Sequence, residues 1–167
     1  MARFSALFDQ AKFLAEDRRM YQNILIATDG SKLAESAVSH GVSLAKFTGA
    51  KVVALIVETP FNVFNVPESQ VRQMSEAFAK HTDNIKHHAT KVLDYVARTA
   101  KTADVPCKTI QLEHDQPYQA IIGVANDQGC DLIVMASHGR SGISAVLLGS
   151  VTNKVLAHTK IPVLVCH

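Results

Sequence analysis

The sequence predicts an α/β fold, an open parallel sheet with helices on both faces. Three continuous apolar runs support this prediction, in the segments 23–28, 52–57 and 132–135. Strands that are apolar throughout are buried on both faces, which is typical of parallel sheets. Helical patterns, with apolar residues three and four positions apart, separate the runs. Strand and helix therefore alternate along the chain.

The first repeat of strand, helix and strand covers residues 23–57. Its helix begins after Ser31, a favourable N-cap, and ends at Gly49. One apolar stripe follows the helix, formed by Leu33, Ala34, Ala37, Val38, Gly41, Leu44 and Ala45. Such a short connection between parallel strands predicts a right-handed βαβ unit.

The second strand leads into a loop, 58–67, that contains the apolar residues Phe61, Val63, Phe64 and Val66. These residues either form a flap over a ligand or fold back onto the core or a partner. A long helical pattern follows over 68–103. Its apolar stripe thins around Lys80–Asn84, so the first part of the helix is expected to overhang the core or fray.

The remaining segments complete the sheet. The strand predicted at 107–112 alternates weakly, as an edge strand does. Pro117 begins a helix that ends near Gly129. After the strand at 132–135, a last helix runs from Gly149 to about His158, and Ile161–Cys166 forms the terminal strand. This apolar strand predicts antiparallel pairing with a second copy in a two-fold dimer.

Composition excludes several classes of function. The chain has 167 residues, 47% of them hydrophobic, and a net charge of +2, which predicts one globular domain without a nucleic-acid surface. Three scattered cysteines are typical of reduced thiols in a cytoplasmic protein. No spacing of Cys and His matches a zinc site. No segment is long and apolar enough to span a membrane.

Residues 1–19 form a predicted amphipathic helix that precedes the first strand. Its apolar residues recur at helical spacing between charges of mixed sign. The mixed charge favours packing against the body of the protein or a partner over lying on a membrane surface.

The stretch 131–155 combines a buried strand, a loop of small residues and the start of a helix. Ligands of open parallel sheets bind outside the carboxyl ends of the strands. Gly139 and Gly142 can adopt backbone angles that turn amides inward, and Gly149 lets an anion approach the positive end of the helix. Ser150 either caps this helix or donates its hydroxyl to the anion. The alternative is that the glycines only form a surface turn.

Asp29 ends the first strand at the same edge of the sheet. Its carboxylate either stabilises the turn, binds the sugar or ring of a nucleotide, or holds a divalent metal beside the phosphates.

The chain resembles the universal stress protein family over residues 20–167. The resemblance rests on four segments: ILIATDGS, MASHGR, LLGSVTNKVL and PVLVC. It implies a five-stranded parallel sheet with strand order 3-2-1-4-5 and dimerisation through the last strand. Residues 1–19 then form an N-terminal helical extension of a nucleotide-binding domain, 20–167.

Some members of that family bind ATP through a motif of glycine, two residues, glycine, nine residues, glycine and serine or threonine. Gly139, Gly149 and Ser150 match, while Ala136 replaces the first glycine and is expected to trim the site. The resemblance implies the following neighbours of ATP or AMP: Ala27 and Thr28 at the floor, Asp29 at the ribose or a nucleotide-bound Mg²⁺, Val57 at adenine, and Gly139, Gly149, Ser150 and Val151 at the phosphates. His138 and Arg140 flank the loop and face either the phosphates or solvent.

Three functions remain open from the sequence. The first is an adenine-nucleotide binding module in stress response or signalling, in which occupancy orders the loop 137–148. The second is an ATP hydrolase. Its turnover is expected to be slow, because the motifs contain neither the Walker A lysine nor a nucleophile paired with a base. The third is a nucleotide-free dimeric interaction protein, for which Ala136 is the hint.

Overall fold

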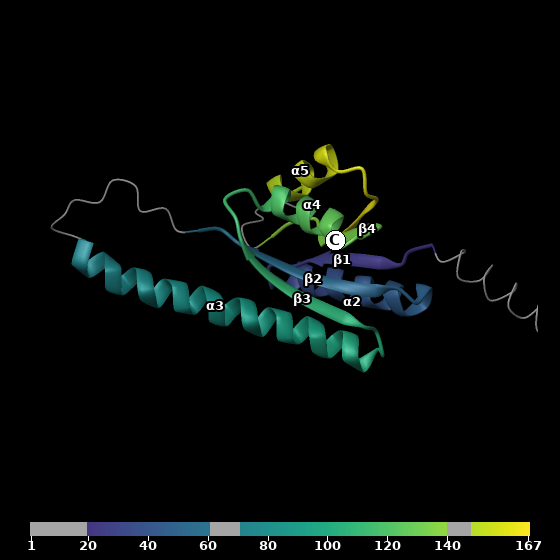
Figure 1. Cartoon of the computed structure of the whole chain (residues 1–167), viewed down its shortest axis with the longest axis horizontal. Coiled ribbons are helices and arrows are strands. Elements are labelled where there is room, and N and C mark those ends of the chain that lie inside the picture. Colours follow the sequence, from purple (N-terminus) through teal and green to yellow (C-terminus); the bar gives the residue numbers. More distant parts are fainter. Residues whose placement is uncertain (1–19, 61–70, 140–147) are drawn as a thin grey trace, which may run out of the picture.

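The sheet is parallel and has the strand order that the resemblance implies. A computed structural model describes residues 20–60, 71–139 and 148–167. Within them, five strands form one sheet in the order β3-β2-β1-β4-β5 (Figure 1). The strands are β1 (Asn23–Ala27), β2 (Lys51–Glu58), β3 (Cys107–Glu113), β4 (Leu132–Ala136) and β5 (Val163–Cys166). The weakly alternating β3 is an edge strand, as predicted.

Helices cover both faces of the sheet. Figure 1 shows α2 (Lys32–Thr48) and α3 (Val71–Thr102) on one face, with α4 (Pro117–Asp127) and α5 (Ser150–His158) on the other. Ser31 caps α2 by accepting a hydrogen bond from the Ala34 amide at 3.2 Å. Gly49 ends α2 in the left-handed conformation, with φ of 72°. Both ends therefore form for the reasons predicted from the residue types.

The core has two layers, one on each face of the central strands. Ile24 and Ile26 pack in the layer under α2 and α3, while Leu25 packs in the layer under α4 and α5. This division follows from the two-residue period of a strand. Because the inner strands contribute to both layers, they must be apolar throughout.

Two predictions for the helices can be compared with the structure. Leu33 was expected in the buried stripe of α2 but is 38% exposed, because it lies at the flank of a stripe centred on the fully buried Ala37 and Val38. The first turns of α3 extend beyond the sheet, as expected from the thinned stripe (Figure 1). The predictions for residues 1–19 and for the apolar loop residues Phe61, Val63, Phe64 and Val66 lie outside the described residues.

Burial keeps the cysteines as thiols. All three are free. Burial raises the pKa of Cys130 to about 11, with a smaller contribution from the adjacent Asp131. It also raises the pKa of Cys107 and Cys166. A protonated thiol is a poor nucleophile and a poor metal ligand, so none of the three is activated for chemistry at neutral pH.

A carboxylate joins β1 to β4 at the amino edge of the sheet. Asp131 accepts hydrogen bonds from the amides of Gln22, at 2.7 Å, and Asn23, at 3.1 Å. The Asp131 amide in turn donates to the Asn23 carbonyl at 2.9 Å. Asp131 thus fixes the register of the two strands whose opposite ends form the site described below.

Replacing Asp131 with alanine is expected to lower the free energy of unfolding by about 1–3 kcal/mol, because two backbone amides lose a charged acceptor. Chemical denaturation measures this change. Asp94→Ala is the control, since this exposed carboxylate lies in the middle of α3, and it is expected to change stability by less than about 0.5 kcal/mol. Equal losses in the two variants would contradict the role of Asp131.

Candidate functional site

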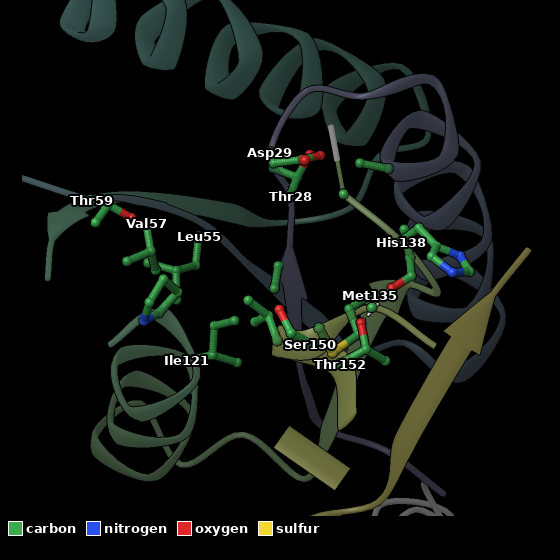
Figure 2. Close-up of a pocket in the computed structure, with 17 residues that line it drawn as sticks. Thr28, Asp29, Leu55, Val57, Thr59, Ile121, Met135, His138, Ser150 and Thr152 are labelled. Carbon is green, nitrogen blue, oxygen red and sulfur yellow. Dashed lines mark hydrogen bonds between the residues drawn. The ribbon is translucent and has the colours of Figure 1, made fainter. Parts of the chain in front are cut away.

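A cavity of about 420 Å³ opens at the carboxyl ends of β1, β2 and β4 (Figure 2). β1 pairs with β2 along one of its edges and with β4 along the other. This is the point where strand order reverses in an open parallel sheet, and connecting segments leave room for a ligand there. The volume lies within the range of small-molecule sites.

Asp29 is held at the cavity by the turn that follows β1. Its Oδ1 accepts a hydrogen bond from the Ser31 amide at 3.0 Å. The Gly30 amide donates to Thr28 Oγ1 at 3.3 Å, and Gly30 has φ of 77°. Glycine adopts this left-handed conformation without strain, so the short turn can keep the carboxylate of Asp29 at the edge of the sheet.

The amino end of α5 is fixed to the end of β4. The Gly149 amide donates to the Ser137 carbonyl at 2.8 Å, and the buried Thr152 hydroxyl donates to the Ala136 carbonyl at 3.0 Å. The Asn153 amide makes the first bond within the helix, to the Gly149 carbonyl. The amides of Ser150, Val151 and Thr152 precede that bond, so they have no acceptor within the helix. They make the amino end of α5 a place for an anion at the cavity.

Gly149, not Ser150, is the N-cap residue of α5, and no side chain caps the helix. The alternative in which Ser150 is the N-cap is therefore wrong. Gly149 has φ of −58°, which other residues also adopt, but a β-carbon here would lie 3.2 Å from the Ser137 carbonyl oxygen. Ser150 is exposed at the first position of the helix and lines the cavity.

Gly139 lies beside Asp29, and both residues line the cavity. A β-carbon on Gly139 would lie 2.8 Å from Asp29 Oδ2. The sequence-based reason for this glycine, a backbone angle denied to other residues, is wrong, because its φ lies outside the left-handed region. Close approach to the carboxylate is what requires glycine here.

The opposite part of the cavity is apolar. Leu55 and Val57 line it from β2, Met135 from β4 and Ile121 from α4. Figure 2 shows Leu55, Val57 and Ile121 on the side of the cavity away from His138. The cavity thus combines apolar side chains with the carboxylate of Asp29 and the amides at the start of α5. An arrangement of this kind suits a flat apolar ring joined to a polar, anionic group.

The structure brings together ten of the twelve residues that the sequence predicts for the site. They are Ala27, Thr28, Asp29, Val57, Ala136, His138, Gly139, Gly149, Ser150 and Val151. The other two, Arg140 and Gly142, lie outside the described residues. Sequence reasoning missed seven further residues that line the cavity, namely Ala34, Leu55, Thr59, Pro117, Ile121, Met135 and Thr152.

The missed apolar residues look like ordinary core in the sequence. Strand alternation was the signal available for Leu55, which lies two residues before Val57 and therefore on the same face of β2. No such signal marks Ile121, because only the packing of α4 beside α5 brings it to the cavity.

Ala136, which replaces the first motif glycine, is among the residues that line the cavity. Its backbone is that of a strand, and it packs in the core layer under α2 and α3. Met135, its neighbour in β4, belongs to the other layer and lines the cavity wall. Within the described residues, the only non-glycine residue with positive φ is Asp104. Ala136 therefore does not have a positive φ, and alanine adopts its backbone conformation without strain.

Among the described residues that line the cavity, His138 and Asp29 have titratable side chains. His138 Nδ1 lies 3.2 Å from the Ser137 hydroxyl, and Figure 2 shows the ring on the side opposite Val57 and Thr59. Among the described residues, no group of three or more His, Cys, Asp or Glu side chains could hold a metal ion.

Comparison with known proteins shows which family the sequence matches. The sequence model of the universal stress protein family matches residues 20–167. Universal stress protein MJ0531 of Methanocaldococcus jannaschii is 32% identical over 147 residues, which cover 87% of this chain and 82% of that protein. Universal stress protein YxiE of Bacillus subtilis is 31% identical over 147 residues, which cover 87% of this chain and 99% of that protein.

Solved structures share the fold. The structure of protein MJ0577 superposes with a TM-score of 0.71 at 28% identity and covers 88% of this chain and 96% of its own. A universal stress protein in complex with cAMP superposes with a TM-score of 0.65 at 24% identity and covers 88% of this chain and 97% of its own.

No helix in the described residues is long and apolar enough to cross a membrane.

Proposed function

Since the chain belongs to the universal stress protein family, we propose that its cavity binds an adenine nucleotide, ATP or AMP, and that occupancy of the cavity is the signal it gives in a stress response. Adenine lies against the apolar wall that contains Val57. The ribose hydroxyls bind Asp29, and the phosphates bind the amides at the start of α5. A Mg²⁺ ion carried by the nucleotide lies near Asp29.

One observation carries this proposal: the carboxylate of Asp29 and the amino end of α5 line one cavity, together with an apolar wall. A sugar offers hydroxyl donors to the carboxylate, and a phosphate offers acceptors to the amides. An adenine ring buries its faces against aliphatic side chains. A ligand with only one of these three parts would leave the other two surfaces of the cavity unused.

The universal stress protein solved in complex with cAMP supports the ligand class, because cAMP is an adenine nucleotide. That protein shares the fold with this chain, which is the extent of the likeness at 24% identity. The proposal of ATP or AMP therefore rests on the chemistry of the residues that line the cavity. A volume of about 420 Å³ accommodates a nucleotide within the usual range of ligand sites.

The proposal includes a conformational signal. Gly139 and Gly149 border the cavity at the two ends of the segment 140–148. Phosphates bound between them fix the positions of both ends, so occupancy is expected to fix the conformation of that segment. Slower amide hydrogen exchange in 137–148 on addition of ATP would support this part of the proposal, and unchanged exchange at saturating ATP would contradict it.

The protein is further proposed to act as a cytoplasmic homodimer through β5. This strand lies at an edge of the sheet, and Leu164 on it is 38% exposed. Leu156, on α5, the helix that precedes β5 in the chain, is 41% exposed. Pairing β5 with the same strand of a second copy satisfies the backbone groups of the edge and covers apolar side chains. Sedimentation equilibrium measures the mass of the assembly, and a monomer at micromolar concentration would contradict this part of the proposal.

Mass spectrometry of the denatured protein, purified without added nucleotide, tests the ligand directly. Carried-over ATP or AMP supports the proposal. Calorimetry with ATP, AMP and GTP, each with magnesium, then gives the affinities, and GTP serves as the control for the ring. Absence of carried-over nucleotide together with no binding heat for any of the three would overturn the proposed function.

Replacing Ala136 with glycine is expected to change the affinity for ATP by less than about twofold, because the residue packs in the core layer under α2 and α3 and has a strand backbone that alanine and glycine can both adopt. The free energy of unfolding should fall by about 1 kcal/mol, since glycine weakens a strand. Calorimetry and chemical denaturation measure the two effects. A rise in affinity of tenfold or more would show that alanine obstructs the site.

A further inference from the structure

A histidine of α3 reaches the turn that carries Asp29. His88 Nε2 lies 3.3 Å from the main-chain carbonyl oxygen of Asp29. A carbonyl oxygen only accepts hydrogen bonds, so Nε2 must be the donor. The contact joins residues that are 59 positions apart in the sequence. This hydrogen bond is not one of the regular backbone bonds of a helix or the sheet. His88 is also not part of the sequence motifs that predicted the site.

A second residue of α3 completes the contact one helical turn later. A β-carbon on Gly30 would overlap Val92 Cγ2 and would lie 3.1 Å from His88 Nε2. Residues four positions apart lie on the same face of a helix, so His88 and Val92 together hold the turn from one side. Ala89 and Leu93 beside them are buried in the core layer under α2 and α3, which fixes this face of α3 in place.

The position of the Asp29 carboxylate depends on the same turn. Its Oδ1 is bound by the Ser31 amide, and its Oδ2 lies where a β-carbon on Gly139 would be 2.8 Å away. Rotation of the peptide between Asp29 and Gly30 would move both the Asp29 carbonyl group and the Gly30 amide, which donates to Thr28 Oγ1 in the turn that brings the Ser31 amide to the carboxylate. The hydrogen bond from His88 opposes that rotation, because it fixes the carbonyl group of the same peptide.

We propose that His88 is a positioning residue for the nucleotide site: its Nε2–H holds the Asp29 peptide so that the carboxylate points into the cavity. The inference rests on the proposed function for its ligand but on the described contacts for its geometry. His88 touches no ligand. It acts through Asp29, and it makes α3 part of the support of the site.

A double-mutant cycle with His88→Leu and Asp29→Ala tests this, with ATP affinity measured by calorimetry. His88→Leu alone is expected to weaken binding about three- to tenfold, the usual effect of one hydrogen bond. In the Asp29→Ala background, the same change should have no further effect, because the group it positions is gone. Equal and additive losses in both backgrounds would overturn the proposal.

Two further variants separate positioning from a general effect on the fold. His88→Gln retains a side-chain N–H donor and is expected to restore most of the affinity, which loss of packing alone would not allow. His87→Leu is the matched control, because His87 is the exposed neighbour in the same helix, and it should leave affinity unchanged. Failure of glutamine to exceed leucine would overturn the proposal.

Amide hydrogen exchange without ligand makes the test independent of the proposed function. His88→Leu should accelerate exchange of the Gly30 and Ser31 amides about three- to tenfold, and His88→Gln should restore their protection. If the unmodified protein binds no adenine nucleotide but these exchange rates change as expected, the proposed function fails while the positioning of the turn stands. Unchanged exchange in His88→Leu overturns the positioning itself.

Discussion

Replacing Gly139 with alanine is expected to weaken adenine-nucleotide binding about ten- to a hundredfold, the effect of losing a hydrogen bond to a charged group. The new β-carbon would lie 2.8 Å from Asp29 Oδ2, closer than real β-carbons approach other atoms. Either the carboxylate leaves its position or the end of β4 moves away. Both responses separate the sugar-binding group from the phosphate-binding amides. Calorimetry with ATP and magnesium measures the loss.

The control for this change is Gly123→Ala in α4. A β-carbon at Gly123 would meet no atom within 4 Å. Affinity should stay unchanged in this variant, and stability should rise by up to about 1 kcal/mol, because alanine favours a helix over glycine. Binding by Gly139→Ala that equals the binding of this control would contradict the geometry assigned to Asp29.

Replacing Gly30 with alanine is expected to lower the free energy of unfolding by about 2–5 kcal/mol. Two effects add at this position. Alanine is strained at φ of 77°, which costs about 1–2 kcal/mol. Its β-carbon would also overlap Val92 Cγ2, and overpacking typically costs about 1–3 kcal/mol. Chemical denaturation measures the change.

Gly129→Ala separates the two effects. Gly129 has φ of 61°, but a β-carbon there would meet no atom within 4 Å. This variant carries only the backbone strain, so it should lose about 1–2 kcal/mol. Equal losses in Gly30→Ala and Gly129→Ala would show that α3 does not pack tightly on the turn, contrary to the described contacts.

The fold was largely predictable because burial on both faces leaves a clear pattern in the sequence. The runs that became β1, β2 and β4 are apolar throughout, and Ser31 and Gly49 mark the ends of α2. Leu33 shows the limit of such patterns. Its spacing matched the stripe of α2, but which flank of a helix reaches the sheet depends on how the helix packs, and sequence spacing does not determine this.

The site was predictable where chemistry depends on residue type at a chain position. Asp29, Gly139 and Gly149 have this character, and all three line the cavity. The reason for Gly139 was not predictable, since it depends on the distance to a carboxylate more than 100 residues earlier. The contact of His88 was not predictable for the same reason, since it joins residues far apart in the sequence. Its spacing in a long amphipathic helix carries no sign that it meets the Asp29 carbonyl.

Titration of ¹⁵N-labelled protein with AMP shows whether the nucleotide binds in the cavity, because amide chemical shifts report the place of binding as well as its affinity. We expect saturable shifts at Gly139, Gly149, Ser150 and Val151, together with Asp29 and Val57, and small shifts at the amino edge of the sheet around Asn23 and Asp131. Saturable shifts confined to other parts of the chain, or none at millimolar AMP and ATP, would contradict binding in the cavity.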